Sequence, residues 1–261
     1  MSRSRKISAI IPVYNEEDNI LDCINSVQWA DEILVADSFS TDKTLEIVKN
    51  IPKTRIIQRE YKYSTSQKNW AIPQAKYDWI LIVDADERVP KELSKEIKNA
   101  VNSNGHQDLI VAFRIRRNNY FLGKKIRYSG WQNDNVIRLF KKENARYEDK
   151  YVHGKLIVDG KTGELKNRLE HYTIKTINEY LNKIEKYTTW HAMEKNKKRK
   201  KSNIIIILFR SAFKFIRDYI FRFGFLDGTY GFILCGLSAF SEFIKYSKLW
   251  NLRKGGYFNE S

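Results

Sequence analysis

The chain has 261 residues, of which 42% are hydrophobic and 13% aromatic, so it can bury a core of one large domain and is not a disordered protein. Its 47 basic and 31 acidic residues give a net charge of +16, which indicates an anionic partner such as nucleic acid, a membrane surface or a phosphorylated substrate. Two cysteines, Cys23 and Cys235, exclude a disulfide scaffold and a four-cysteine zinc site. The first residues lack the apolar core of a signal peptide, so we expect a cytoplasmic protein.

Short apolar runs alternate with segments of helical periodicity in the first hundred residues. The expected strands cover 7–13, 32–36, 55–58 and 79–83, and the expected helices cover 19–29, 41–48, 64–75 and 90–101. This order predicts an α/β fold, in which a parallel sheet is covered by helices on both faces. Ligands of such sheets bind at the carboxyl ends of the strands.

Carboxylates follow two of these strands. Asp84 and Asp86 follow the run 79–83, and Asp37 follows the run 32–36. Two carboxylates at positions i and i+2 can face one divalent cation together with nucleotide phosphates, because Mg²⁺ and Mn²⁺ prefer oxygen ligands. The alternatives are a solvated acidic loop for Asp84 and Asp86, and a capping or loop role for Asp37.

Seven short motifs occur in order over nearly the whole chain. They are Ile11-Pro-Val-Tyr-Asn-Glu-Glu17, Val35-Ala-Asp-Ser-Phe-Ser-Thr-Asp42, Val83-Asp-Ala-Asp-Glu-Arg-Val89, Gly130-Trp-Gln-Asn-Asp134, Arg138-Leu-Phe140, Val152-His153 and Gly224-Phe-Leu-Asp-Gly228. The ordered set resembles glycosyltransferase family 2, and more narrowly the lipopolysaccharide inner-core β-glucosyltransferases of Gram-negative bacteria. Gly154 departs from that subgroup, which usually carries glutamate after the histidine, and this leaves the acceptor open.

The resemblance implies a GT-A fold, a nucleotide-sugar donor, a divalent cation (Mn²⁺ or Mg²⁺) and inversion at the anomeric carbon. It places six residues around the donor: Pro12, Tyr14 and Glu16 at the nucleoside, Asp37 at the base, Asp84 at the ribose or metal, and Lys68 near the diphosphate. It makes Asp86 the direct metal ligand. For Lys68, an exposed helix lysine is the alternative.

An inverting transfer also needs a carboxylate that takes the proton from the acceptor hydroxyl. The resemblance places Asp134 in that position, after Gly130-Trp131, whose aromatic ring could face a sugar. From the residues alone, Asp134 would be a turn aspartate, and Glu87 is the second candidate for the base.

Histidine and arginine supply the remaining candidates. Many GT-A enzymes place a histidine on the metal or diphosphate, and His153 is the candidate here, with a backbone-bonded structural histidine as the alternative. Arg138 could pair with an aspartate or contact phosphate. His106 and His171 have no supporting context, so they are interpreted as surface or loop residues.

The C-terminal part is basic and helical. We expect a catalytic domain over residues 1–170 and a helical region over residues 171–261, where residues 191–261 carry +9 of the net charge and Lys195–Lys201 has six basic residues in seven. Between residues 203 and 223, Arg210, Lys214, Arg217, Asp218 and Arg222 share one helix face, and Ile206, Phe209, Phe213, Ile216, Ile220 and Phe223 lie largely opposite. The longest uncharged stretch there is eight residues, too short to span a bilayer. This composition favours a helix at the inner face of the cytoplasmic membrane, against the alternative that it packs on the catalytic domain.

Three functions are compatible with these features. The favoured one is an inverting, metal-dependent hexosyltransferase that moves a sugar, glucose by resemblance, from a UDP-sugar to a lipid-linked surface glycan such as the lipopolysaccharide core. The second keeps the donor chemistry but transfers to polyprenyl phosphate. The third is a nucleic-acid-binding protein, but it lacks a recognisable binding motif and leaves the strand-end aspartates unexplained, so we expect no nucleic-acid partner.

Overall fold

The computed structural model describes residues 4–103, 109–149 and 154–256. The chain divides into two compact units: residues 1–117 with 134–171, and residues 118–133 with 172–261. These units differ from the expected division at residues 118–133, which group with the C-terminal helices. The strands β6 (Ile110–Phe121) and β11 (Lys161–Ile174) contribute residues to both units.

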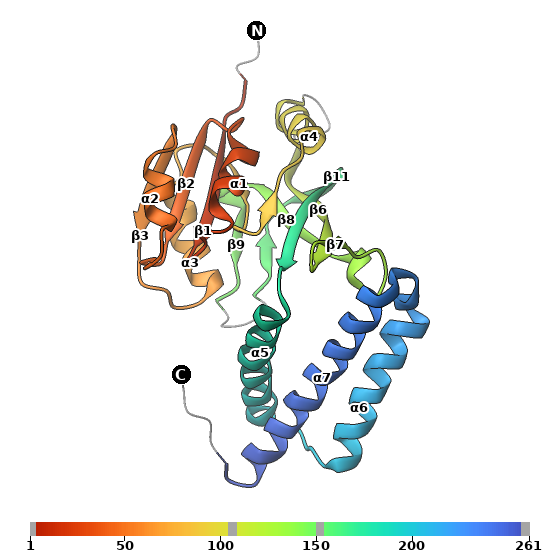
Figure 1. Cartoon of the computed structure of the whole chain (residues 1–261). Coiled ribbons are helices and arrows are strands. Elements are labelled where there is room, and N and C mark those ends of the chain that lie inside the picture. The colour runs from red at the N-terminus through yellow and green to blue at the C-terminus, as the bar shows by residue number, and fades with distance from the viewer. Residues whose placement is uncertain (1–3, 104–108, 150–153, 257–261) are drawn as a thin grey trace. The chain divides into compact units, whose positions relative to one another are not determined.

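The first unit is built on a mixed sheet whose strand order is β3-β2-β1-β4-β8-β6-β11-β5 (Figure 1). Four neighbouring strands are parallel, as predicted: β1 (Ile7–Val13), β2 (Glu32–Asp37), β3 (Thr54–Gln58) and β4 (Trp79–Ile82). The other half continues with antiparallel pairs and contains β8 (Asn135–Lys141) and the short β5 (Glu87–Arg88). A small separate sheet pairs β9 (Ala145–Tyr147) with β10 (Leu156–Val158), and β7 (Lys124–Lys125) pairs with the end of β6.

Alternate residues of the central strand enter two different cores. Ala9, Ile11 and Val13 of β1 join a cluster with the helices α1 (Ile20–Val27) and α4 (Lys91–Asn102). Ile10 joins a second cluster with α3 (Ser64–Ala71) and the 3-10 turn Ile72–Gln74. The sheet is therefore covered on both faces, which explains why its parallel strands read as continuous apolar runs. The helix α2 (Thr44–Lys49) connects β2 to β3.

The second unit consists mainly of three helices, α5 (Ile177–Lys197), α6 (Ile204–Ile216) and α7 (Gly228–Arg253), of which α7 packs against both others (Figure 1). A π-helical turn (Arg217–Phe221) and a 3-10 turn (Gly224–Asp227) join α6 to α7. The turn requires glycine at Gly231, because a Cβ there would lie 1.9 Å from the carbonyl oxygen of Gly224. Among the described residues, no helix combines the length and hydropathy needed to cross a bilayer.

Candidate active site

Two loops at the carboxyl ends of β1 and β2 are joined by hydrogen bonds. Asn15, with φ of +54°, donates its backbone N–H to Ser40 Oγ at 3.0 Å, and its side-chain oxygen accepts from the backbone of Thr41 at 2.8 Å. The backbone of Glu16 donates to Thr44 Oγ1 at 2.8 Å, and its carboxylate accepts from Asn19 at 2.7 Å. The two loops thus form one ordered rim at this edge of the sheet.

Asp37, at the end of β2, holds this rim in place through hydrogen bonds. Its carboxylate is fully buried and accepts from the Ser40 backbone and hydroxyl and, at 3.0 Å, from Gln58 Nε2. Asp37 therefore orders the loop after β2. Of the residues expected beside it, Pro12 is half-buried and Tyr14 is 54% exposed. Of the residues expected at the nucleoside, Tyr14 has the ring most open to a ligand.

Asp84 is bound by two cations at the end of β4. Lys68 Nζ lies 2.9 Å from its Oδ1, and Arg138 donates to its Oδ2. Burial would raise the pKa of Asp84, but the charges of Arg138 and Lys68 outweigh it and hold that pKa far below its usual range. Lys68 is itself buried, so the interpretation as an exposed helix lysine is wrong.

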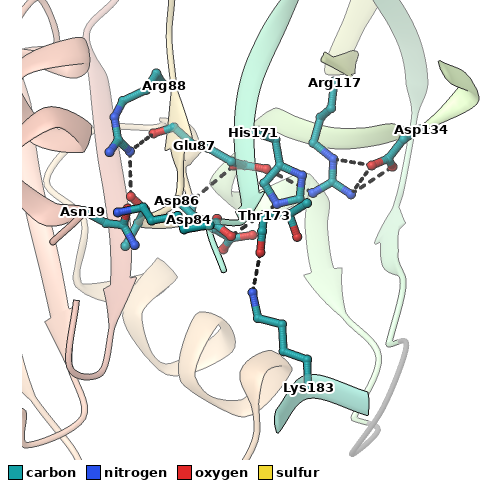
Figure 2. A network of polar contacts seen from close by, with 12 residues as sticks. Asn19, Asp84, Asp86, Glu87, Arg88, Arg117, Asp134, His171, Thr173 and Lys183 are labelled. Atoms are coloured by element: carbon teal, nitrogen blue, oxygen red, sulfur yellow. Dashed lines mark hydrogen bonds and ion pairs between the residues drawn. The ribbon is translucent and has the colours of Figure 1, made fainter. Parts of the chain in front are cut away.

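Glu87 links this aspartate to Asp134 (Figure 2). It is fully buried, and one of its oxygens accepts from Arg138 at 2.7 Å and from Arg117 at 3.1 Å. Arg117 in turn donates to both oxygens of Asp134, at 2.9 and 2.8 Å. Burial opposes the charge on each arginine, but the carboxylates raise the pKa of both above its ordinary value. Glu87, Arg117 and Arg138 thus connect the strand-end Asp84 with Asp134.

The network has equal numbers of opposite charges: Lys68, Arg138 and Arg117 against Asp84, Glu87 and Asp134. Because Glu87 is fully enclosed by its partners, its carboxylate is not placed to take a proton from an incoming hydroxyl. Asp134, at the far end of the chain of contacts from Asp84, has 27% of its side chain exposed, whereas Glu87 has none exposed. Of the two carboxylates expected as the base, Asp134 is therefore the one that solvent reaches.

We predict that Glu87→Gln lowers the free energy of unfolding by about 3–5 kcal/mol, because it leaves two buried arginines without their shared counter-charge. Urea unfolding measures the change. Glu32→Gln is the matched control: Glu32 is also buried, but its partner Arg55 has 45% of its side chain exposed, so a smaller loss is expected. Equal losses in the two variants would show that Glu87 does not hold the network together.

Asp86 meets His171, which sequence reasoning missed. His171 Nε2 lies 3.3 Å from Asp86 Oδ2, and both side chains are mostly buried (Figure 2). The register of β5 and β11, which pairs Glu87 with His171, produces this contact. The only signal in the sequence was the residue type, because β11 is a polar strand whose pairing with β5 cannot be read from its pattern. His153, the histidine that was expected here, lies outside the described residues.

The pair of Asp86 and His171 fits a divalent cation of the Mn²⁺ type. A carboxylate oxygen suits Mg²⁺ or Mn²⁺, and a neutral imidazole nitrogen is a common ligand of transition metals. Among the described residues, no cluster of three histidine, cysteine or acidic side chains could hold a metal. Further ligands would therefore have to come from nucleotide phosphates and water, as is usual where a cation bridges protein and nucleotide.

Two residues next to expected site positions, Asn69 and Trp131, have structural contacts. Asn69, next to Lys68, exchanges two hydrogen bonds of 2.9 Å with the backbone of Tyr147. Trp131 packs edge-to-face on Phe121, with ring centroids 6.3 Å apart, in the core of the second unit. Both contacts reduce the freedom of these side chains to meet a sugar.

Carboxylates, a histidine and clustered cations thus lie together at the carboxyl edge of the parallel strands, where sheets of this type bind ligands. Residues 8–157, more than half of the chain, match Glycosyl transferase family 2. The protein belongs to glycosyltransferase family 2 and has the GT-A fold.

Two related sequences extend the similarity over most of the chain. An uncharacterized glycosyltransferase of Rickettsia bellii is 31% identical over 264 residues, which cover 95% of this chain and 87% of the relative. The lipopolysaccharide core biosynthesis glycosyltransferase LpsC of Rhizobium meliloti is 28% identical over 247 residues, covering 90% and 86%. The crystal structure of S. aureus TarS 1-349 in complex with UDP superimposes with a TM-score of 0.49 at 17% identity, covering 97% and 93%.

Proposed function

We propose that the protein is an inverting, metal-dependent hexosyltransferase that moves a sugar from a UDP-sugar, glucose in the first instance, to a lipid-linked surface glycan such as the lipopolysaccharide core. The observation that carries the proposal is the continuous network from Lys68 and Asp84 to Asp134 beside the pair of Asp86 and His171. It joins residues expected at the donor to the expected base. LpsC, a relative over most of both chains, supports a glycan of the lipopolysaccharide core as acceptor.

In the proposed reaction, an acceptor hydroxyl oxygen forms a bond to the anomeric carbon while the bond from that carbon to the diphosphate breaks. Asp134 takes the hydroxyl proton, and UDP leaves with the electron pair. Arg117 holds both oxygens of Asp134, which fixes the direction in which the carboxylate faces. An Mn²⁺ or Mg²⁺ ion held by Asp86 and His171 would supply Lewis-acid neutralisation of the diphosphate.

The remaining cations position the donor side. Lys68 and Arg138 hold Asp84 ionised and in one orientation at the end of β4. The rim formed by the loops after β1 and β2, with the exposed ring of Tyr14, would receive the nucleoside. Because these groups are held by mutual contacts before a ligand arrives, little reorganisation is needed on binding.

We expect one UDP-sugar to raise the melting temperature only when Mn²⁺ or Mg²⁺ is present, because a ligand that binds the folded state stabilises it by mass action. At 100 times the dissociation constant the gain is about 2.7 kcal/mol, which corresponds to roughly 5–10 °C for a chain of this size. Thermal unfolding against UDP-glucose, UDP-galactose, UDP-N-acetylhexosamines and UDP alone measures it.

Two outcomes would contradict the proposed function. A shift with duplex DNA or RNA and none with any nucleotide sugar would overturn the transferase proposal. A shift with a UDP-sugar followed by transfer to polyprenyl phosphate, and not to a lipopolysaccharide-type acceptor, would keep the donor and replace the acceptor.

A further inference from the structure

The helix α6 exposes its apolar face. Phe209, Phe213, Ile216 and Ile220, spaced by four, three and four residues along α6 and the turn after it, are between 43% and 64% exposed. Ile204 and Ile205 at the start of the helix are more than 70% exposed, and α6 contains no buried residue. A helix on the surface of a protein in water normally buries such a stripe.

The charged side of the same segment has a buried centre, although Arg210 and Arg222 on that side are exposed. Asp218 is almost fully buried and is contacted by Lys214 at 2.7 Å, Arg217 at 2.8 Å and Arg222 at 3.2 Å. These contacts hold the charged side of the segment together, and α6 packs along α7 (Figure 1). Asp218 is therefore buried among basic residues, while the apolar side of the segment stays exposed.

α7 extends the exposed apolar surface. Phe232, Phe240, Phe243 and Trp250 are 39–54% exposed, and three of them, Phe232, Phe243 and Trp250, share one line along the helix. Between the two helices lies a groove of about 460 Å³, lined by seven residues: Ser211, Ala212, Phe215, Ile216, Ala239, Phe240 and Phe243. The outer surface of this helix pair thus has the chemistry of a core without a protein layer over it in the described chain.

A basic cavity of about 360 Å³ lies at the start of this stripe. It is lined by Lys195, Lys200, Lys201 and Arg210 together with Ile205, Ile206, Phe209 and Tyr246. Lys195 and Arg210 lie over the ring of Tyr246, at 5.3 and 5.9 Å, and no acidic side chain in the described segments pairs with any of the four cations. An anionic group would find four positive charges here, directly beside exposed Ile205 and Phe209.

We propose that this surface, made of α6, the turn after it and the exposed face of α7, docks on a bilayer that contains anionic phospholipid. The apolar residues of α6 enter the acyl region, with the helix parallel to the membrane plane, and the basic cavity binds headgroup phosphate. A phospholipid carries phosphate covalently next to acyl chains, which matches a basic cavity adjoining an apolar stripe. The biological use of the surface rests on the proposed lipid-linked acceptor.

Co-sedimentation of the full chain with vesicles tests the proposal. Vesicles with 30% phosphatidylglycerol in phosphatidylcholine are expected to retain the protein, and pure phosphatidylcholine to retain at least about tenfold less. The double variant Lys200→Gln/Lys201→Gln should weaken binding to the anionic vesicles about 10- to 30-fold, because each of the two basic residues near the surface contributes roughly a factor of three to five. Phe209→Ser/Phe213→Ser should weaken binding to both kinds of vesicle, since it removes apolar surface and no charge.

Matched controls separate position from composition. Lys91→Gln/Lys95→Gln removes two exposed lysines from α4, and Leu21→Ser/Leu109→Ser removes two exposed apolar side chains from the first unit. Both controls should bind vesicles as the unaltered chain does. All replaced residues are exposed, so each variant should fold. Circular dichroism with thermal unfolding checks this.

Two results would overturn the proposal. One is equal vesicle binding by all variants, which would assign the affinity to net charge alone. The other is a dimer in light scattering that Phe209→Ser/Phe213→Ser makes monomeric, without vesicle binding by the unaltered chain, which would assign the surface to a second copy. Vesicle binding is measured without nucleotide or acceptor, so its failure is distinguishable from failure of the transferase proposal.

Discussion

Asp134→Asn is expected to lower turnover about 10²–10⁴-fold while donor affinity stays near that of the unaltered protein, since an amide cannot take the acceptor proton. In the proposed mechanism this partly exposed carboxylate is the base, and Arg117 fixes its orientation. Initial rates with saturating donor, together with the donor-induced thermal shift, separate the two quantities.

Two variants sharpen this test. Asp22→Asn removes a carboxylate whose side chain is 74% exposed on α1 and should change neither rate nor affinity. Arg117→Lys keeps the proposed base but loses the two-pronged contact, so we expect an intermediate rate. Near-normal turnover of Asp134→Asn would show that another carboxylate is the base. Loss of donor binding would show that Asp134 binds the donor.

Asp86→Asn is expected to abolish measurable binding of Mn²⁺ in the presence of UDP, and with it the metal dependence of donor binding. Loss of a residue that only supports a metal ligand costs about 10–100-fold in metal affinity, so loss of a ligand should cost more. Electron paramagnetic resonance of free Mn²⁺ during a titration measures this binding without any need for turnover. Unchanged Mn²⁺ binding would remove Asp86 as a ligand.

The neighbouring residues provide the comparison. Asp84→Asn should keep Mn²⁺ binding within about tenfold but lower stability, because both oxygens of Asp84 contact Lys68 and Arg138 and not the position between Asp86 and His171. His171→Ala and His153→Ala compare the two candidate histidines. A loss of Mn²⁺ affinity in His153→Ala but not in His171→Ala would show that His153, the histidine expected from the motif, is the metal ligand.

The parallel half of the sheet could be predicted from local runs of apolar residues. The strands β1, β2 and β4 are continuous apolar runs because helices cover both faces of the sheet, and such runs can be recognised without knowing their partners. Since the carboxyl ends of parallel strands share one edge, Asp37, Asp84 and Asp86 could be assigned to that edge in advance. The roles within it could not: Asp37 orders a loop, and Asp84 is held by two cations.

The antiparallel half of the sheet was not predicted, for a physical reason. β11 reads Lys-Thr-Gly-Glu-Leu-Lys-Asn-Arg-Leu-Glu-His-Tyr-Thr-Ile, with few apolar residues, and it lies between β6 and the two-residue strand β5, both distant in the sequence. That register alone brings His171 to Asp86. The contacts of Glu87 with Arg117 and Arg138 depend in the same way on strand order.

The sequence by itself determined the family motifs, the parallel strands, the edge on which the carboxylates lie, and the existence of a basic amphipathic helix between residues 203 and 223. Only the tertiary structure decided which side chains meet in the charge network and which face of α6 is exposed. Periodicity divides a helix into an apolar and a charged side, but packing decides which side is buried. Here Asp218 is buried in contact with Lys214, Arg217 and Arg222, and the apolar side remains exposed.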